Sequence, residues 1–278
     1  MSINVSPIFQ IEFSAQVKAA YDRRGGLRTV VDNRTGVIGN TYHFRRSGRG
    51  MAVPHVPFTS RQAMNTTFTP IVCNLQAWDA TEFVDSIEEM FTNAQYRARL
   101  AENVSRAIGG REDQTIIDAL VAGFGGGATI GASATGLTDA KMREVVRRFE
   151  DRGVPAENRH MLISAVGYDN LLAETRYSSQ DFGGTNSVRD GRLPTVYGVQ
   201  MHVVETRPEG GLPTQAGPPV VRQNFAFDSM AVGVALGREN ALVIERRPDI
   251  TAWQINQQLA IGAVIIDPDG VIRVDTQE

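Results

Sequence analysis

The first 75 residues most constrain how this chain can fold, because they hold too few apolar residues for a core of their own. Residues 35–44 have a strand-like composition, and over residues 71–77 apolar side chains alternate as in a half-buried strand. Between them, residues 45–66 are polar and are interrupted by two glycines and two prolines. Two strands around a polar excursion predict a protruding hairpin, which must lie against another surface to be stable.

Two helices are predicted in the first half of the chain. Apolar residues fall at helical spacing between Phe9 and Ala20, which predicts a short amphipathic helix ending near residues 23–26, followed by a strand over residues 27–31. A capping-box spacing at Asp79 and Glu82 and apolar steps of three and four predict a long helix over residues 79–122.

The second half reads as a compact α/β region followed by strands. Thr138 can cap a helix that stops at Gly153. Further short helices are predicted at residues 168–172 and 230–236. Strands are predicted at residues 160–164, 199–203, 225–228, 242–246, 252–266 and 271–274.

Composition excludes several classes of protein. The 278 residues carry 28 basic and 31 acidic side chains, a net charge of −3, which argues against binding nucleic acid by bulk positive charge. One cysteine, Cys73, excludes an intramolecular disulfide and any multi-cysteine metal site. No apolar run approaches the roughly 20 residues of a membrane-spanning helix, and no secretory leader is recognisable, so we expect no membrane association.

No group of residues has the spacing of a catalytic or metal site. The histidines His43, His55, His160 and His202 share no metal-ligand spacing and are interpreted as isolated surface or edge residues. Cys73 alternates with apolar neighbours, as a packed thiol does. This absence favours a protein that works by contacting copies of itself, without cofactors or metals.

A glycine-rich segment at residues 123–127 superficially resembles a phosphate-binding loop. Such loops follow a strand and precede a helix, and the P-loop also ends in Gly-Lys-Ser/Thr. Here a predicted helix comes first and no lysine lies nearby, so a hinge is the favoured interpretation. An α/β enzyme that uses this loop for a phosphate ligand stays open as an alternative.

Several short motifs follow one another along nearly the whole chain. They are Gln16-Val-Lys-Ala-Ala-Tyr21, the glycine-bounded hairpin of residues 39–48, Ile71-Val-Cys73, Glu82-Phe-Val-Asp85, Thr115-Ile-Ile-Asp-Ala-Leu120, Gly153-Val-Pro155, Arg159, Leu162-Ile-Ser164, Leu171-Leu172, Gly198-Val199 and Ala231-Val-Gly-Val-Ala235. In number and order they resemble the major capsid proteins of tailed bacteriophages, which have the Hong Kong 97-type fold shared by encapsulins.

The resemblance implies an α+β, Hong Kong 97-like major capsid fold. Residues 1–34 would be the N-terminal arm and residues 35–72 the extended loop, a β-hairpin. Residues 73–137 and 240–278 would form the peripheral domain with its long spine helix. Residues 138–239 would form the axial domain. In such proteins the arm and the extended loop lie on neighbouring subunits.

The resemblance also implies a structural function in the virion, with assembly in the host cytoplasm. Hexamers and pentamers of this chain would tile an icosahedral shell around double-stranded DNA. The contacts between the shell and the DNA would be weak and non-specific. Other expected partners are a separate scaffolding protein, a portal protein at one vertex and a decoration protein where one exists. Residues 35–72 contain no lysine, so the covalent cross-link of some relatives is excluded.

The candidate site residues are those of the subunit interface. On the extended loop we expect ion pairs from Arg45, Arg46 and Arg49, and apolar burial of Met51, Val53 and Val56. The expected acidic partners on a neighbour are Asp85, Glu88 and Glu89. A rival function with the same fold is the shell of an encapsulin-like compartment that holds cargo enzymes, and particle contents would separate the two.

Overall fold

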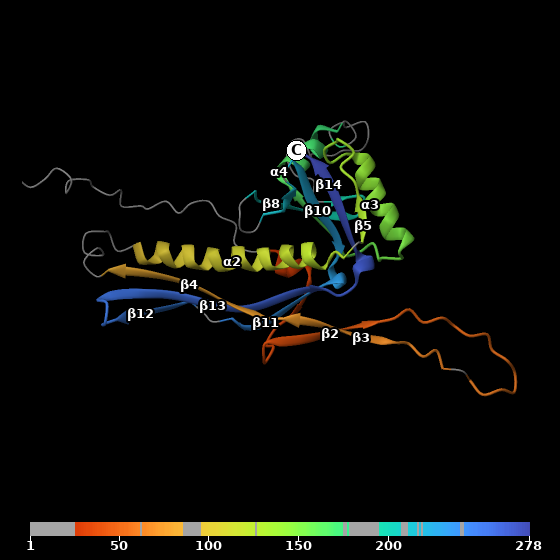
Figure 1. The fold of residues 1–278 in the computed structure, drawn as a ribbon, viewed down its shortest axis with the longest axis horizontal. Coiled ribbons are helices and arrows are strands. Elements are labelled where there is room, and N and C mark those ends of the chain that lie inside the picture. Colours follow the sequence, from red (N-terminus) through yellow and green to blue (C-terminus); the bar gives the residue numbers. More distant parts are fainter. Residues whose placement is uncertain are drawn as a thin grey trace, which may run out of the picture.

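The computed structural model describes residues 26–61, 63–85, 96–125, 127–174, 177, 195–206, 211–215, 217, 219–239 and 242–278. Two sheets, one long helix, two shorter helices and a projecting hairpin are the main features of this part of the chain (Figure 1). The predicted helix between Phe9 and Ala20 lies outside the described residues. None of the described helices is long and apolar enough to cross a membrane.

The first sheet is built around its longest strand, β13 (Ala252–Ile265). On one side β13 pairs antiparallel with β4 (Gln76–Asp85). On the other it pairs with β12 (Val243–Arg247) and with β11 (Val232–Glu239), which in turn pairs parallel with β1 (Asp32–Arg34). The long helix α2 (Tyr96–Gly123) covers one face of this sheet (Figure 1).

The second sheet has seven strands and carries the two shorter helices. Its order is β5 (Ala128–Ile130), β14 (Val271–Gln277), β10 (Val221–Asp228), β6 (Arg159–Ser164), β8 (Val199–Val204) and β7 (Thr195–Val196), with β9 (Thr214–Gln215) paired to β10. Helices α3 (Asp139–Asp151) and α4 (Ala165–Ala173) pack on one face through side chains such as Met142, Phe149 and Leu171. The other face shares one core with α2 and the first sheet, through Ile116, Phe225 and Ile261 among others.

The predicted helix start at Asp79 is wrong, because residues 76–85 form strand β4. Trp78 and Ala80 pack against the core formed with α2, and β4 pairs along its whole length with β13. The backbone pairing with β13 therefore determines the structure of residues 76–85, although their apolar residues are spaced as in a helix. Helix α2 is confirmed from Tyr96 and runs through Gly110 without interruption.

Two further short elements differ from the prediction. Residues 230–236 are not a helix: a 3₁₀ turn, η4 (Ser229–Ala231), leads into strand β11, whose alternating valines suit a buried central strand. Residues 27–31 are not a strand: they form the 3₁₀ turn η2 (Leu27–Val30). The buried Asp113 carboxylate of α2 accepts hydrogen bonds from the backbone N–H groups of Gly26 and Leu27, which fixes this turn against the helix.

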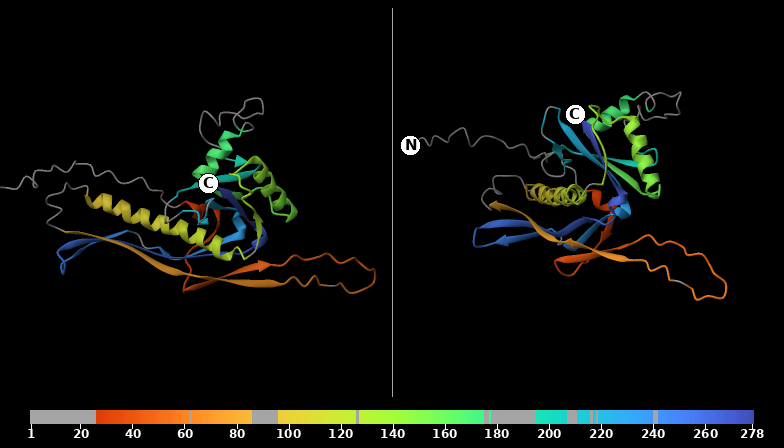
Figure 2. Two further views of the ribbon diagram at one scale, coloured as in Figure 1. Left: turned by 45° about the horizontal axis from the view of Figure 1, so that its top comes forward. Right: turned by 45° about the vertical axis from the view of Figure 1, so that its right-hand side comes forward.

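The protruding hairpin is confirmed. Strands β2 (Thr41–Ser47) and β3 (Phe68–Asn74) pair antiparallel, with Ser47 opposite Phe68 where the connecting loop begins and ends. The connecting residues extend away from both sheets (Figure 2). Strand β2 begins later than the predicted residue 35, because residues 35–40 form an irregular connection.

Sheet membership does not follow the residue ranges expected for the domains. Strand β11, within residues 138–239, belongs to the first sheet, and β14, within residues 240–278, belongs to the second. The chain therefore crosses between the two sheets at η4 and at the turn η5 (Pro268–Gly270). The assignment of ranges to the domains of a capsid subunit stays a prediction.

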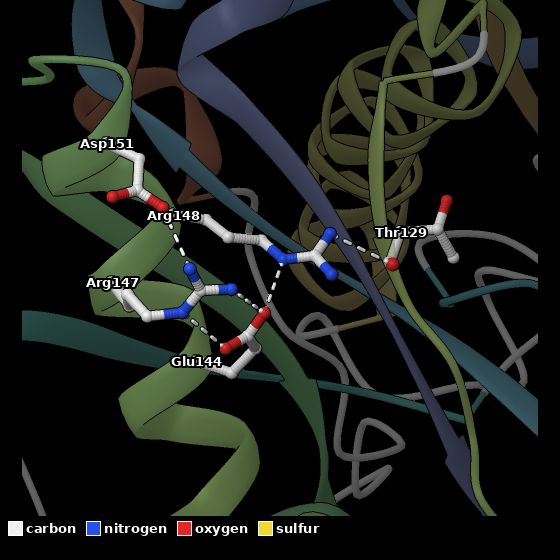
Figure 3. Close-up of polar contacts among 5 residues, drawn as sticks. All are labelled: Thr129, Glu144, Arg147, Arg148 and Asp151. Atoms are coloured by element: carbon white, nitrogen blue, oxygen red, sulfur yellow. Dashed lines mark hydrogen bonds and ion pairs between the residues drawn. The ribbon is translucent and has the colours of Figure 1, made fainter.

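Polar side chains fix α3 at its outer surface and at its start. The Glu144 carboxylate accepts hydrogen bonds from Arg147 and Arg148, which lower its pKa to about 2 (Figure 3). Arg148 also donates to the carbonyl oxygen of Thr129 in β5. In the first turn of the helix, the buried Lys141 ammonium donates to three backbone carbonyl oxygens at 2.8–3.0 Å, including that of Asp275 in β14. These contacts join the helix to both neighbouring strands.

Candidate subunit interface

The loop at the end of the hairpin exposes a set of large apolar side chains. Met51, Val53 and Val56, predicted from the sequence, are exposed. The structure adds Phe58 and Met64 in the loop and Phe68 at the start of β3, and Phe58 is fully exposed. Side chains of this size, clustered on a projecting loop, indicate a surface that contacts another molecule.

The root of the hairpin, in contrast, is fixed to the body of the protein. Phe44 of β2 and Cys73 of β3 are buried with Ala235 and Ile266. Burial raises the pKa of the Cys73 thiol, which agrees with a packed, unreactive side chain. At Gly262 of β13 the β3 backbone comes so close that a Cβ atom there would lie 2.3 Å from the carbonyl oxygen of Asn74.

The three predicted arginines of the hairpin have different surroundings. Arg45 is exposed on β2 and makes no ion pair within the described part of the chain. Arg46 pairs with Asp267 at 3.0 Å and Asp269 at 3.5 Å, in the turn between β13 and β14. Arg49 donates a hydrogen bond to the backbone carbonyl oxygen of Arg152, next to the end of α3.

Asp85, the predicted acidic partner that the structure describes, is not close to the hairpin of its own subunit. Asp85 is exposed at the C-terminal end of β4, and that end lies at the opposite end of the subunit from the hairpin loop (Figure 1). Glu88 and Glu89 lie outside the described residues. A contact between the loop and the end of β4 therefore requires two copies of the chain arranged head to tail.

One prediction about the histidines is wrong. His160 and His202 are not isolated: their Nδ1 and Nε2 atoms lie 3.1 Å apart, because β6 and β8 pair in parallel with Leu162 opposite His202. Burial lowers the pKa of His160 and raises the pKa of the nearby Asp228. Within the described residues no group of three or more histidine, cysteine or acidic side chains is placed to bind a metal ion.

The glycine-rich segment does not have the geometry of a phosphate loop. Helix α2 ends at Gly123, Phe124 is buried and the N–H of Gly127 donates to the Phe124 carbonyl oxygen before β5 begins. The segment thus follows the C-terminal end of a helix, where unpaired carbonyl oxygens carry partial negative charge. Phosphate groups bind at the opposite end of helices.

Comparisons with known proteins agree with this geometry. A family model described as phage capsid protein matches residues 5–278. No curated protein sequence matches the chain.

Three solved structures of phage capsids or heads have the same fold and very different sequences. The capsid structure of cyanophage P-SCSP1u has a TM-score of 0.77 at 16% identity, covering 97% of this chain and 93% of that one. The head structure of Helicobacter pylori bacteriophage KHP40 has a TM-score of 0.76 at 11% identity, covering 99% and 98%. The capsid of Ralstonia phage GP4 has a TM-score of 0.69 at 14% identity, covering 100% and 98%.

Proposed function

This chain belongs to the phage capsid protein family, and from that premise we propose that its copies form hexamers and pentamers which tile the icosahedral head of a tailed bacteriophage around double-stranded DNA. As a major capsid protein it is a structural component of the virion. The work of the protein is self-assembly, and it requires no catalytic step and no cofactor.

The observation that carries the assembly proposal is the hairpin. Its apolar loop is exposed at one end of the subunit, and the end of β4 lies at the other (Figures 1 and 2). Two different surfaces at opposite ends produce a head-to-tail contact, and such contacts close into rings when the rotation between subunits allows it. A ring of five or six copies is the repeating unit of the proposed shell.

Within this contact we propose two kinds of interaction. Met51, Val53, Val56 and Phe58 become buried on the neighbouring subunit, which removes apolar area from water. Arg45 pairs with acidic groups of the neighbour, with Asp85, Glu88 and Glu89 as its candidate partners. An exposed ion pair contributes only about 0.2–1 kcal/mol, so the apolar burial supplies most of the stability and the charges select the register.

The domain roles follow from the same proposal. Residues 1–34 serve as the N-terminal arm, 35–72 as the extended loop, 73–137 with 240–278 as the peripheral domain, and 138–239 as the axial domain. Scaffolding, portal and decoration proteins are the proposed protein partners. Contact with DNA is weak and independent of sequence, because a chain of net charge −3 releases few counterions.

Electron microscopy of the purified full-length protein tests the function. The expected result is closed shells of uniform size, together with free capsomers of five or six subunits. Particles that enclose a folded enzyme instead of being competent to hold DNA would favour the compartment function. A protein that stays monomeric at every concentration, with and without a scaffolding partner, would contradict the proposal.

A further inference from the structure

Besides the apolar packing around Phe44 and Cys73, a group of polar contacts joins the root of the hairpin to the body of the protein at the end of β2. Three segments meet there: the end of β2, the residues that follow α3, and the turn η5 between β13 and β14. The Arg46 guanidinium lies 3.0 Å from a carboxylate oxygen of Asp267 and 3.5 Å from one of Asp269. Arg49 donates to the backbone carbonyl oxygen of Arg152.

Arg152 completes the connection between the second and third segments. Its guanidinium donates to the carbonyl oxygens of Pro268 at 3.4 Å and Asp269 at 3.1 Å. Each of the three segments is thus linked to another by at least one hydrogen bond or ion pair. Arg49, Arg152, Asp267 and Asp269 also line a small surface cavity of about 150 Å³ at this junction.

The neighbouring Arg45 differs in its environment although it is adjacent in the sequence. Successive side chains of a strand point to opposite faces. Arg46 is half-buried beside η5, whereas Arg45 is exposed and lies opposite Pro70 of β3. The two arginines are therefore available to different partners.

We propose that Arg46, Arg49, Arg152, Asp267 and Asp269 form a brace that sets the direction of the hairpin within its own subunit. This inference rests on the proposed function and divides the basic side chains of the hairpin into two roles. Arg45 contacts the neighbouring subunit, and Arg46 and Arg49 orient the loop that carries the apolar side chains.

The length of the loop makes its direction sensitive to the brace. About ten residues separate Ser47 from the middle of the loop, and an extended chain advances roughly 3.3 Å per residue. A rotation of about 10° at the root would therefore move the middle of the loop by about 6 Å, more than the width of a methyl group. A weak set of contacts at the root can thus decide whether the apolar side chains reach their site on the neighbour.

A charge exchange within one chain, compared with the same exchange between chains, tests the brace. We expect Arg46→Asp to lower the yield of sedimenting shells at least tenfold. The double variant Arg46→Asp/Asp267→Arg should restore most of that yield, because it rebuilds the ion pair inside each subunit. A mixture of Arg46→Asp chains with Asp267→Arg chains should not restore it, because each chain lacks one half of its internal pair.

Restoration by the mixture to the level of the double variant would overturn the proposal, because Arg46 would then pair between subunits. An unchanged yield for Arg46→Asp would overturn it as well. The milder Asp267→Asn/Asp269→Asn variant guards against misfolding, and in the unassembled subunit its backbone amides in β2 and β3 should exchange hydrogen at least threefold faster. Exchange at the rate of the unaltered protein would contradict the brace.

Arg45→Asp is the matched control, since it makes the same charge change one residue away. It should reduce assembly without accelerating amide exchange in β2 and β3, and Asp267→Arg in the same chain should not rescue it. Normal assembly of this control would refute the proposed interface and leave the test of the brace intact.

Discussion

Replacing Phe58 by alanine tests the apolar part of the interface. Phe58 is fully exposed in the single subunit, so its ring makes no contribution to the core of its own chain. Truncation should therefore leave the free energy of unfolding of the subunit within about 0.5 kcal/mol of its original value. Any larger effect must arise where the ring is buried, in the assembled shell.

The expected magnitude follows from that burial. Fully burying a phenylalanine side chain stabilises a contact by about 1.5–3 kcal/mol. With one such contact per subunit, a loss of about 2 kcal/mol raises the concentration needed for assembly about 30-fold, because about 1.4 kcal/mol corresponds to a factor of ten.

The assay is reassembly of dissociated shells over a series of protein concentrations, followed by light scattering and sedimentation. Val220→Ala is the control, because Val220 is also an exposed apolar residue but lies next to β10, away from the hairpin. The proposed burial of Phe58 between subunits would be refuted if Phe58→Ala assembled at the same concentration as Val220→Ala. It would also be refuted if Phe58→Ala unfolded the isolated subunit.

Three further predictions concern stability and are measured by denaturant unfolding of the isolated subunit. Gly262→Ala should destabilise it by about 1–3 kcal/mol, since the added Cβ would meet the Asn74 carbonyl oxygen at 2.3 Å. The control Gly110→Ala, in an open position of α2, should stabilise it by about 0.5–1 kcal/mol. Equal effects of the two substitutions would contradict the close approach at Gly262. Lys141→Met should cost about 1–3 kcal/mol because it removes three hydrogen bonds to backbone carbonyl oxygens, and an unchanged midpoint would refute that role. Burial lowers the pKa of His160 from 6.5, so just below pH 6.5 the unfolded chain binds more protons than the folded one, and this residue's contribution to stability falls as the pH drops. The free energy of unfolding of His160→Gln should therefore depend less on pH than that of the unaltered protein. An identical pH dependence would count against a buried neutral imidazole.

Local sequence patterns predicted the elements whose stability is local. The hairpin, helix α3 with its stop at Gly153, and the strands around the turn at residues 267–270 are all confirmed. In each case the signal is a turn residue or a helix stop beside a clear apolar period, and no distant segment overrides it.

The wrong predictions fall where contact with a segment distant in the sequence determines the local structure. The spacing from Asp79 onward fits a helix, but β13 offers ten residues of backbone pairing that the local pattern cannot reveal. The same holds for β11, which is a strand because it lies between β1 and β13, and for His160 and His202, which meet only through the parallel pairing of β6 and β8.

The candidate interface was predictable in its location more than in its details. The lack of a core in residues 45–66 indicated a surface for another copy, and Phe58 and Met64 could have been included on the same ground, as apolar residues in a segment with nothing of its own to pack against. The different surroundings of Arg45 and Arg46 could not be predicted. They depend on the turn at Asp267 and Asp269, which reaches the hairpin only in the folded chain.

A cryo-electron-microscopy map of the assembled shell would show directly whether the subunits join through the hairpin, because it shows what lies against residues 48–67 of each subunit. This loop is expected to lie on the adjacent subunit, with the Phe58 ring buried between the two copies. A shell in which the loop folds back on its own subunit, or stays in solvent while the subunits join through other surfaces, would contradict it.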